Sequence, residues 1–259
     1  MQGLTSNLYA WACQNIGTRQ IQEDTYRFSS EQVRDTHGVL SVLSDGIGGM
    51  KDGARFSRIA TETMIEHFES HPPHRSLCDC LIECYEAAQQ AAIREQPEKA
   101  SEQGGATLTA VLFRQDQCAT LSIGDSRIYL LRQGGLIQLS RDQVLGPRLD
   151  ERAALGFLTR DQAEKNTERK TLMANIGRES ALPPDVCAHP FQLVPGDRII
   201  QVSDGVFGTL SDERLEALLQ EDVPDPAEHV IQTVMDEKKA QQDNCSIIIL
   251  SYEGLNVRS

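Results

Sequence analysis

The chain has 259 residues, of which 39% are hydrophobic, and a formal net charge of −13. This length and apolar content allow a sizeable core that needs neither disulfides nor a structural metal to fold. The acidic balance argues against a general binder of nucleic acid or of anionic membranes, because it repels their phosphates, and it favours metal cations.

The cysteines also restrict the class of protein. There are seven, and none forms a Cys-x-x-Cys pair. An odd number without metal-site spacing is typical of a reducing compartment. No apolar run is long enough to span a bilayer, and the first residues lack the basic start and apolar centre of a signal peptide. We therefore expect a cytoplasmic monomer that contacts neither membrane nor nucleic acid.

The first half of the chain predicts strands and then helices. Alternating runs at 8–13 and 25–28, and an apolar run at 38–44, predict three strands. Apolar residues at helical spacing predict a helix over 52–69, and an Ala- and Leu-rich stretch predicts another over 77–93.

The middle of the chain predicts a series of hairpins. Turn residues divide four short strands, at 104–113, 117–124, 126–133 and 135–140, so an antiparallel sheet is expected. Residues 144–183 mix charged and polar side chains and show little periodicity.

The last part predicts two strands, two helices and a final strand, at 187–193, 198–203, 211–220, 226–239 and 245–250. Strands at both ends of the chain and helices in two pairs favour a single domain over 1–259. We expect the α+β class, with two antiparallel sheets packed face to face and helices on their outer faces, which makes a four-layer α-β-β-α sandwich.

Acidic residues recur at the strand ends. Asp45 and Asp204 each end a predicted strand within Ser-Asp-Gly, and Asp243 begins the last one. If that strand runs antiparallel to the others, the three carboxylates meet at one edge. Clustered carboxylates raise one another's pKa unless cations lie among them, and hard divalent cations prefer oxygen ligands. We expect Gly46 and Gly205 to leave their carbonyl oxygens uncovered for such ions.

Other charged residues could join this edge. Glu23 and Asp24 lie in the turn before strand 25–28, and Asp125 lies at a predicted hairpin tip. A single Asp-Gly pair is more often a solvated turn, so the prediction depends on the combination. Arg19 has two interpretations: it pairs with Glu23 on the surface, or its guanidinium binds an oxyanion beside the metals.

A set of motifs in a fixed order then resembles a known family. The chain resembles the metal-dependent PP2C/PPM protein phosphatases of serine and threonine, of the bacterial type. The motifs are R-x-x-x-E-D from Arg19, S-D-G-I-G-G from Ser44, G-G-A-T from Gly104, I-G-D-S-R from Ile123, L-S-R-D-Q from Leu139, S-D-G-V from Ser203 and D-N-C-S from Asp243.

The resemblance implies a fold and a pair of metal ions. The fold is the sandwich expected above, with a variable flap at about 144–170. Two manganese or magnesium ions would lie at one end. Asp45 would bridge both ions, the Gly46 carbonyl would bind the second, and Asp204 and Asp243 would hold the first. A hydroxide that bridges the ions would attack phosphorus in line.

The resemblance also implies roles for the remaining candidates. Glu23 and Asp24 would position metal-bound waters, Arg19 would bind the phosphate, and Asp125 would bind a weaker third ion. Gly208 stands where many relatives carry a side-chain ligand of that third ion, so we expect no tight third site.

Two departures concern histidines that are common in relatives. Just after the first Asp-Gly motif, many relatives carry a histidine that is proposed to protonate the leaving oxygen. The candidate positions in this chain hold Ile47 and Met50. Loss of this histidine is expected to cost rate, because general acid help is typically worth about 10²–10⁴-fold. Gln143 replaces another histidine, and we interpret this as a structural change.

Three functions follow, from different classes. The first is a protein serine/threonine phosphatase that acts on phosphorylated proteins and opposes a kinase. The second is a hydrolase of small phosphate esters, and the third is an inactive phospho-binding module. Basic residues in and beside the flap either dock acidic or phosphorylated protein segments or are merely solvated: Arg141, Arg148, Arg152, Arg160, Lys165, Arg169 and Lys170.

Overall fold

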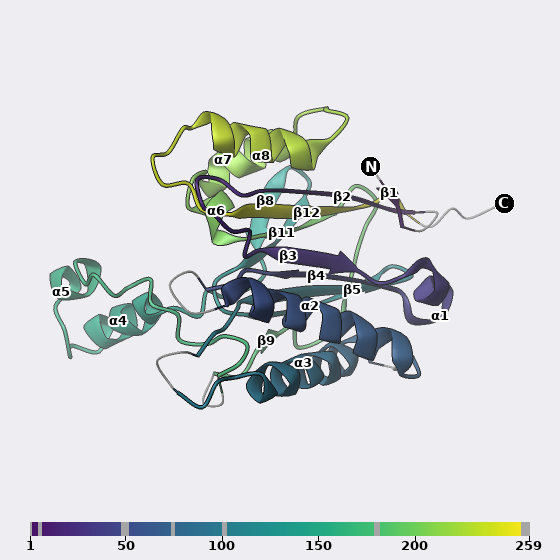
Figure 1. Ribbon diagram of the computed structural model, residues 1–259. Coiled ribbons are helices and arrows are strands. Elements are labelled where there is room, and N and C mark those ends of the chain that lie inside the picture. Colours follow the sequence, from purple (N-terminus) through teal and green to yellow (C-terminus); the bar gives the residue numbers. More distant parts are fainter. Residues whose placement is uncertain are drawn as a thin grey trace.

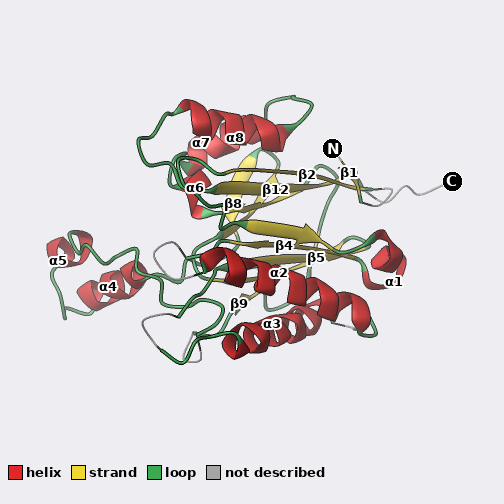
Figure 2. Ribbon diagram, viewed as in Figure 1, coloured by secondary structure: helices red, strands yellow, loops and turns green. Residues whose placement is uncertain are grey.

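The computed structural model describes residues 2–4, 7–47, 52–73, 76–99, 103–178 and 182–254. Two antiparallel sheets face each other in the middle of the molecule, and helices cover their outer faces (Figures 1 and 2). The predicted four-layer α-β-β-α sandwich is confirmed. No helix within these described ranges is both long and apolar enough to cross a bilayer.

The first sheet joins the two ends of the chain. Its strands pair antiparallel in the order β1 (Gln2–Gly3), β2 (Leu8–Asn15), β12 (Cys245–Tyr252), β11 (Arg198–Val202), β7 (Arg127–Arg132) and β8 (Gly135–Gln138). The second sheet has the order β10 (Phe191–Gln192), β6 (Gln117–Ile123), β5 (Leu108–Arg114), β4 (Val39–Ser44) and β3 (Thr25–Phe28), with β9 (Asp185–Val186) also paired to β6.

Two pairs of helices form the outer layers. The helices α2 (Gly53–Ser70) and α3 (Leu77–Arg94) pack on the second sheet, and α7 (Asp212–Leu219) and α8 (Pro226–Asp236) pack on the first. Short helical turns lie elsewhere: η1 (Glu31–Val33), α1 (Arg34–His37) and α6 (Asp204–Phe207). Side-chain oxygens of Ser76 and Asp225 accept backbone N–H groups at the starts of α3 and α8. Such caps fix where a helix begins.

The central strands are buried on both faces, which explains their continuous apolar runs. All residues of β4 and all of β12 are buried. Leu43 and Ile248 belong to the apolar cluster between the two sheets. A buried amide also joins the sheets, because Gln201 Nε2 donates to Thr109 Oγ1 at 3.0 Å. Burial on both faces makes these strands rigid supports for the residues at their ends.

The predicted series of hairpins is wrong at one connection. The pairs β5–β6 and β7–β8 are hairpins, but β6 and β7 belong to different sheets. The chain crosses between the sheets at Gly124, whose φ of +97° favours glycine. Asp125 therefore lies on a crossover and not at a hairpin tip. The predicted strand at 187–193 is confirmed only in part, because β10 covers two of its residues, after Pro190, while β9 ends before it at Val186.

The predicted flap holds two helices that its weak periodicity did not reveal. They are α4 (Leu145–Ala154) and α5 (Arg160–Glu164), and they extend from one end of the sandwich (Figure 1). Within them only Gly146, Leu149 and Ala163 are buried. So narrow an apolar stripe gives little periodic signal. One signal was present, because Thr159 and Gln162 form a capping box at the start of α5.

Candidate metal centre

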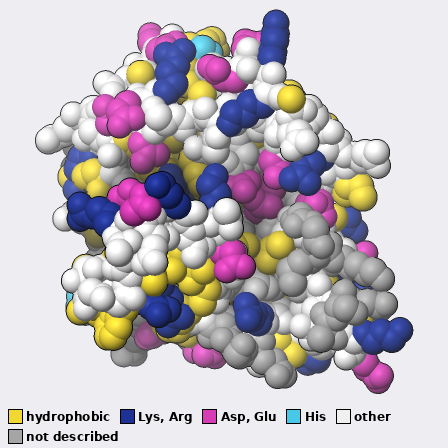
Figure 3. Space-filling model, turned by 90° about the vertical axis from the view of Figure 1, so that its left-hand side faces the viewer, with side chains coloured by type: hydrophobic (Ala, Val, Ile, Leu, Met, Phe, Trp, Pro, Cys, Tyr) yellow, Lys and Arg dark blue, Asp and Glu magenta, His cyan; other side chains and the backbone are white. Residues whose placement is uncertain are grey.

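One pocket at the end of the two sheets gathers six of the eight predicted site residues. It has a volume of about 170 Å³ and is lined by Arg19, Asp45, Gly46, Ile47, Thr107, Asp125, Lys170, Leu172, Asp204 and Asp243. Figure 3 faces this end of the molecule and shows acidic side chains gathered in a hollow with basic ones around them. Glu23 and Asp24 do not line the pocket.

Asp45 follows β4 and is fixed by the Gly-Gly-Ala-Thr motif. Its backbone N–H donates to Thr107 Oγ1 at 3.1 Å, and its carbonyl accepts from the Thr107 N–H at 2.8 Å. The hydroxyls of Thr107 and Ser126 are 2.7 Å apart, which ties this pair to the crossover beside Asp125. The backbone of Asp45 is thus held on both sides while its carboxyl faces the pocket.

The two glycines after the acidic residues are required by close packing. A Cβ atom on Gly46 would lie 2.4 Å from the carbonyl carbon of Gly53, and one on Gly205 would lie 2.0 Å from the Asn244 oxygen. The expectation of an uncovered Gly205 carbonyl is wrong. That oxygen accepts hydrogen bonds of 3.0 Å from Thr209 Oγ1 and Gln242 Nε2. Gly46 lines the pocket, so its carbonyl stays a candidate ligand.

Asp204 begins a helix and does not end a strand as predicted. The strand β11 ends at Val202, and Asp204 is the first residue of α6. Ser203 ties this junction to the last strand, because its N–H donates to the Ser246 carbonyl at 3.1 Å. Asp204 is thereby held at the end of two paired strands.

Arg19 is paired with a carboxylate, but not with the one suggested by sequence. Its Nη2 atom lies 2.5 Å from Asp243 Oδ2. The other oxygen of Asp243 accepts the Asn244 N–H at 2.8 Å. The pair is exposed, at 47% for the Arg19 side chain and 39% for that of Asp243, so it adds little to stability. Because it lies in the pocket, it can open for a ligand at modest cost.

Asp24 is buried behind the pocket. Its Oδ2 atom accepts hydrogen bonds from Ser203 Oγ at 2.8 Å and Ser246 Oγ at 2.7 Å. Its Oδ1 atom is also buried, and no hydrogen-bond partner for it lies among the described residues. A buried carboxylate oxygen without a donor indicates a place for water or a cation. Glu23 is less buried, and its carboxyl lies against Gly53.

Burial and mutual repulsion raise the pKa values of four carboxyls, those of Asp24, Asp45, Asp125 and Asp204. Burial, and then the charges of Asp24 and Asp204, raise the pKa of Asp45 well above its usual range. Burial also raises the pKa of Asp24 to about 6 and that of Asp125 to about 7. The pKa of Asp204 is raised by burial and by Asp243, while the charges of Lys170 and Arg19 oppose this shift.

These shifts predict that metal binding releases protons. A carboxyl whose pKa is raised holds a proton near neutral pH, and a cation must displace that proton. We expect apparent Mn²⁺ affinity to rise between about pH 6 and pH 8, with the largest proton release at the low end. Calorimetry in buffers of different ionisation enthalpy measures this release. Equal heats in all buffers at the low end would contradict the prediction.

The donor chemistry of the pocket fits hard divalent cations. It offers carboxylate and carbonyl oxygens, which Mg²⁺ and Mn²⁺ prefer, and the unpartnered Asp24 oxygen lies behind them. No group of three or more His, Cys, Asp or Glu in the described ranges forms a ready cage for an ion. Both oxygens of Asp243 already accept a hydrogen bond, one of them from Arg19, so an ion that binds Asp243 competes with the Arg19 guanidinium for its charge.

Three residues line the pocket that were not predicted as members of the metal site: Thr107, Lys170 and Leu172. Thr107 belongs to the Gly-Gly-Ala-Thr motif. Lys170 ends the flap and was named only among its basic residues, and Leu172 follows it; no motif places either of them in the pocket. Ile47 lines the pocket, and no histidine does among the described residues; Met50, with Gly48 and Gly49, lies outside those residues.

Gln143 has the structural role expected of it. Its backbone N–H donates to the Gly124 carbonyl at 2.8 Å, and its side-chain oxygen accepts the Gly124 N–H at 3.0 Å. Its side-chain nitrogen donates to the Pro183 carbonyl at 2.9 Å. Gln143 therefore fixes the crossover at Gly124, the residue just before Asp125.

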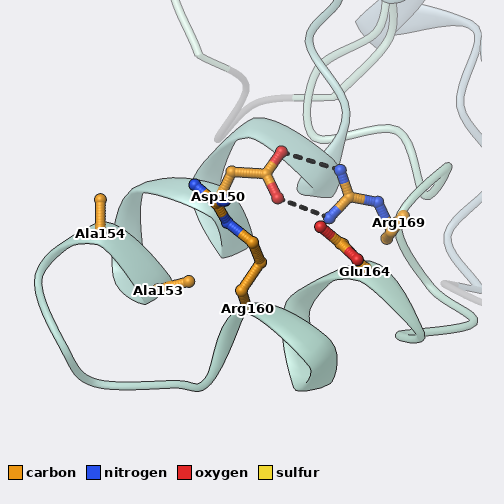
Figure 4. Close-up of a pocket in the computed structure, with 6 residues that line it drawn as sticks. All are labelled: Asp150, Ala153, Ala154, Arg160, Glu164 and Arg169. Carbon is orange, nitrogen blue, oxygen red and sulfur yellow. Dashed lines mark hydrogen bonds and ion pairs between the residues drawn. The ribbon is translucent and has the colours of Figure 1, made fainter.

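The flap has a cavity of its own, of about 390 Å³ (Figure 4). Asp150 on α4 binds Arg169 through two hydrogen bonds of 2.8 Å, and Arg160 and Glu164 of α5 line the same cavity. None of its lining residues lines the pocket of carboxylates. The Asp150–Arg169 pair instead fixes the flap helices to the segment that leads to Lys170.

Comparisons with known proteins agree on one family. A family model described as "Protein phosphatase 2C" matches residues 14–221. The serine/threonine protein phosphatase PstP of Mycobacterium tuberculosis (strain ATCC 25618 / H37Rv) is 30% identical over 215 residues, which cover 81% of this chain and 40% of PstP. The chain therefore spans less than half the length of that relative.

Solved structures agree with this match. A crystal structure of the Mycobacterium tuberculosis phosphatase PstP/Ppp aligns with a TM-score of 0.75 and 27% identity, covering 95% of this chain and 99% of the other. The PstP catalytic domain in complex with two manganese ions aligns with a TM-score of 0.73 and 25% identity, with coverages of 95% and 99%.

Proposed function

The chain belongs to the protein phosphatase 2C family, and on this premise we propose that it hydrolyses phosphoserine and phosphothreonine in proteins. The observation that carries the proposal is the single pocket that joins Asp45, Asp204, Asp243 and Asp125 to Arg19. Clustered carboxylates hold divalent cations, and a guanidinium beside them suits a phosphate.

We propose that the pocket takes two Mn²⁺ or Mg²⁺ ions, the number of manganese ions in the related PstP catalytic domain. Asp45 would contact both ions, the Gly46 carbonyl would contact the second, and Asp204 and Asp243 would hold the first. When bound, such a pair supplies a nucleophile from water at neutral pH and neutralises charge on the phosphoryl oxygens.

The chain's own residues then bind and orient the substrate. Asp24 and Glu23 lie outside the pocket lining and would hold ordered water by accepting hydrogen bonds from it. Arg19 would leave Asp243 once an ion neutralises that carboxylate, and its fork would bind two phosphoryl oxygens. Lys170 lines the same pocket and would place a second positive charge beside the phosphate.

We propose no tight third ion. Gly208 has no side chain to offer, and its carbonyl accepts a hydrogen bond from the Lys239 ammonium. Of the expected ligands of that ion only Asp125 is present.

The proposal also covers the substrate, the oligomeric state and the cellular compartment. Residues 1–259 would act as one phosphatase domain with 144–170 as its flap, as a monomer on proteins that a serine/threonine kinase phosphorylates. All seven cysteines are free, which suits the cytoplasm. Hydrolysis of small esters and phospho-dependent binding without turnover are the alternatives.

Paired substrates separate these functions. Initial rates on a phosphothreonine peptide and on p-nitrophenyl phosphate are compared with Mn²⁺ present, and peptide binding is measured in parallel. A protein phosphatase turns over the peptide at the higher kcat/KM. Preference for the small ester would support the second function, and binding without turnover would support the third.

The flap is predicted to add affinity for acidic phosphopeptides. Arg148 and Arg152 of α4 are exposed. Reversing both charges to glutamate is expected to lower kcat/KM on an acidic phosphopeptide about five- to tenfold, because rim charges steer association. Arg214 on α7 is also exposed and serves as the control for a charge reversal outside the flap. Equal losses on p-nitrophenyl phosphate, or an equal loss in the control, would contradict flap docking.

A further inference from the structure

Two cysteines from distant parts of the chain meet outside the pocket of carboxylates. Cys78 lies in the first turn of α3, and Cys187 directly follows β9, which lies next to α3 in Figure 1. Their Sγ atoms are 3.6 Å apart. The Cys78 thiol also donates to the Cys187 carbonyl at 3.3 Å. The two sulfurs are thus in contact and need little movement to form a bond.

Cys187 is accessible to small molecules, while most other thiols are not. It lines a cavity of about 310 Å³ together with Thr120, Arg141, Asp185 and Phe191. Cys84 is 1% exposed, and Cys118 is fully buried. An oxidant that enters this cavity therefore reaches the Cys187 sulfur before it reaches either of those two.

The Cys187 sulfur contacts groups from two distant parts of the chain. The Thr120 N–H donates to Cys187 Sγ at 3.3 Å, and the sulfur contacts that of Cys78 in the first turn of α3. Arg141 and Asp185 line the same cavity, where the Arg141 backbone N–H donates to Asp185 Oδ2 at 2.8 Å. Burial raises the pKa of the Cys78 thiol to about 12. Cys187 lines the cavity and Cys78 is buried behind it, so Cys187 is the sulfur that an oxidant reaches first, and Cys78 is its partner.

We propose that Cys187 and Cys78 are a modification site at which a hydroperoxide forms a disulfide between β9 and α3. The Cys187 thiolate attacks one peroxide oxygen, the O–O bond breaks, and water or an alcohol leaves with a proton. The resulting sulfenic acid is attacked by the Cys78 sulfur, and hydroxide leaves with the Cys78 proton as water. Two thiols are oxidised, and one peroxide is reduced.

The bond would fasten a segment that leads to the carboxylate pocket. Gln89 of α3 already binds the Gly177 N–H at 2.9 Å and the Arg178 carbonyl at 2.9 Å. The same segment begins with Lys170 and Leu172 in the pocket and ends at Cys187. The crosslink joins positions 109 residues apart, and closing so long a loop restricts the unfolded chain.

Peptide mapping of the whole reduced protein tests the proposal. The protein is treated with limiting hydrogen peroxide, free thiols are blocked with iodoacetamide, and unreduced digests are analysed by mass spectrometry. We expect one main crosslinked species, Cys78 with Cys187, lighter by two hydrogen atoms and reversed by dithiothreitol. The melting temperature of the oxidised form should exceed that of the reduced form by about 5 °C or more.

Matched variants assign the two roles. Cys78→Ser should abolish the crosslink and leave a Cys187 sulfenic acid that dimedone labels. Cys84→Ser, a change to a buried thiol of the same helix, should leave the crosslink intact. A main product that joins other cysteines, or peroxide-treated wild type that keeps every thiol, would overturn the proposal. These readouts do not use phosphatase activity, so they stand or fall separately from the proposed function.

Discussion

Replacing Asp45 by asparagine is expected to lower turnover of a phosphothreonine peptide more than about 100-fold, because even changes behind a metal ligand typically cost 10–100-fold. Asp45 is the carboxylate proposed to contact both ions. Asparagine keeps the size of the side chain and removes its charge. Initial rates over a Mn²⁺ titration measure the effect, and calorimetry measures the affinity for Mn²⁺.

The control is Asp116→Asn in the turn between β5 and β6, at the opposite end of β6 from the pocket. It removes the same charge from the chain and should leave both rate and affinity within about twofold, because surface substitutions away from a site have small effects. Unchanged metal binding in Asp45→Asn would show that the site assignment is wrong.

Replacing Arg19 by alanine is expected to have opposite effects on substrate and on metal. The kcat/KM on phosphopeptide should fall about 10²–10³-fold, the cost of removing a donor that stabilises developing charge. Metal affinity should rise, because Asp243 loses the guanidinium that contacts its Oδ2 atom at 2.5 Å. The two effects are measured on one preparation, by steady-state rates and by Mn²⁺ calorimetry.

Arg19→Lys is the matched control for charge. A lysine keeps the positive charge but lacks the planar fork, so it should recover only part of the rate. If Arg19→Ala instead weakened metal binding, Arg19 would organise the ion site, and its proposed role in binding phosphate would be contradicted.

The sequence predicted the layers well because the strands are buried on both faces. Continuous apolar runs, such as the one that becomes β4, predict such strands wherever they lie in the fold. The crossover at Gly124 was missed because a glycine turn between two strands looks the same whether the strands share a sheet or not. The helices α4 and α5 were missed because they bury few side chains.

The motifs predicted which acidic residues belong to the site, but not which residues they contact. Arg19 lies near Glu23 in sequence, yet it pairs with Asp243, 224 positions away. Such a contact depends on how β12 and β2 align, and local spacing does not carry that information. Lys170 lies in the pocket because the end of the flap returns to it. The need for glycine at Gly205 likewise depends on the distant Asn244 backbone.

The most direct test is release of phosphate from a phosphothreonine peptide with Mn²⁺, with Mg²⁺ and with a chelator, beside an Asp204→Asn variant. The account predicts turnover with either metal, none with chelator, and a loss of more than about 100-fold in the variant. Turnover that persists in chelator or in Asp204→Asn would contradict a metal-dependent phosphatase built on this pocket.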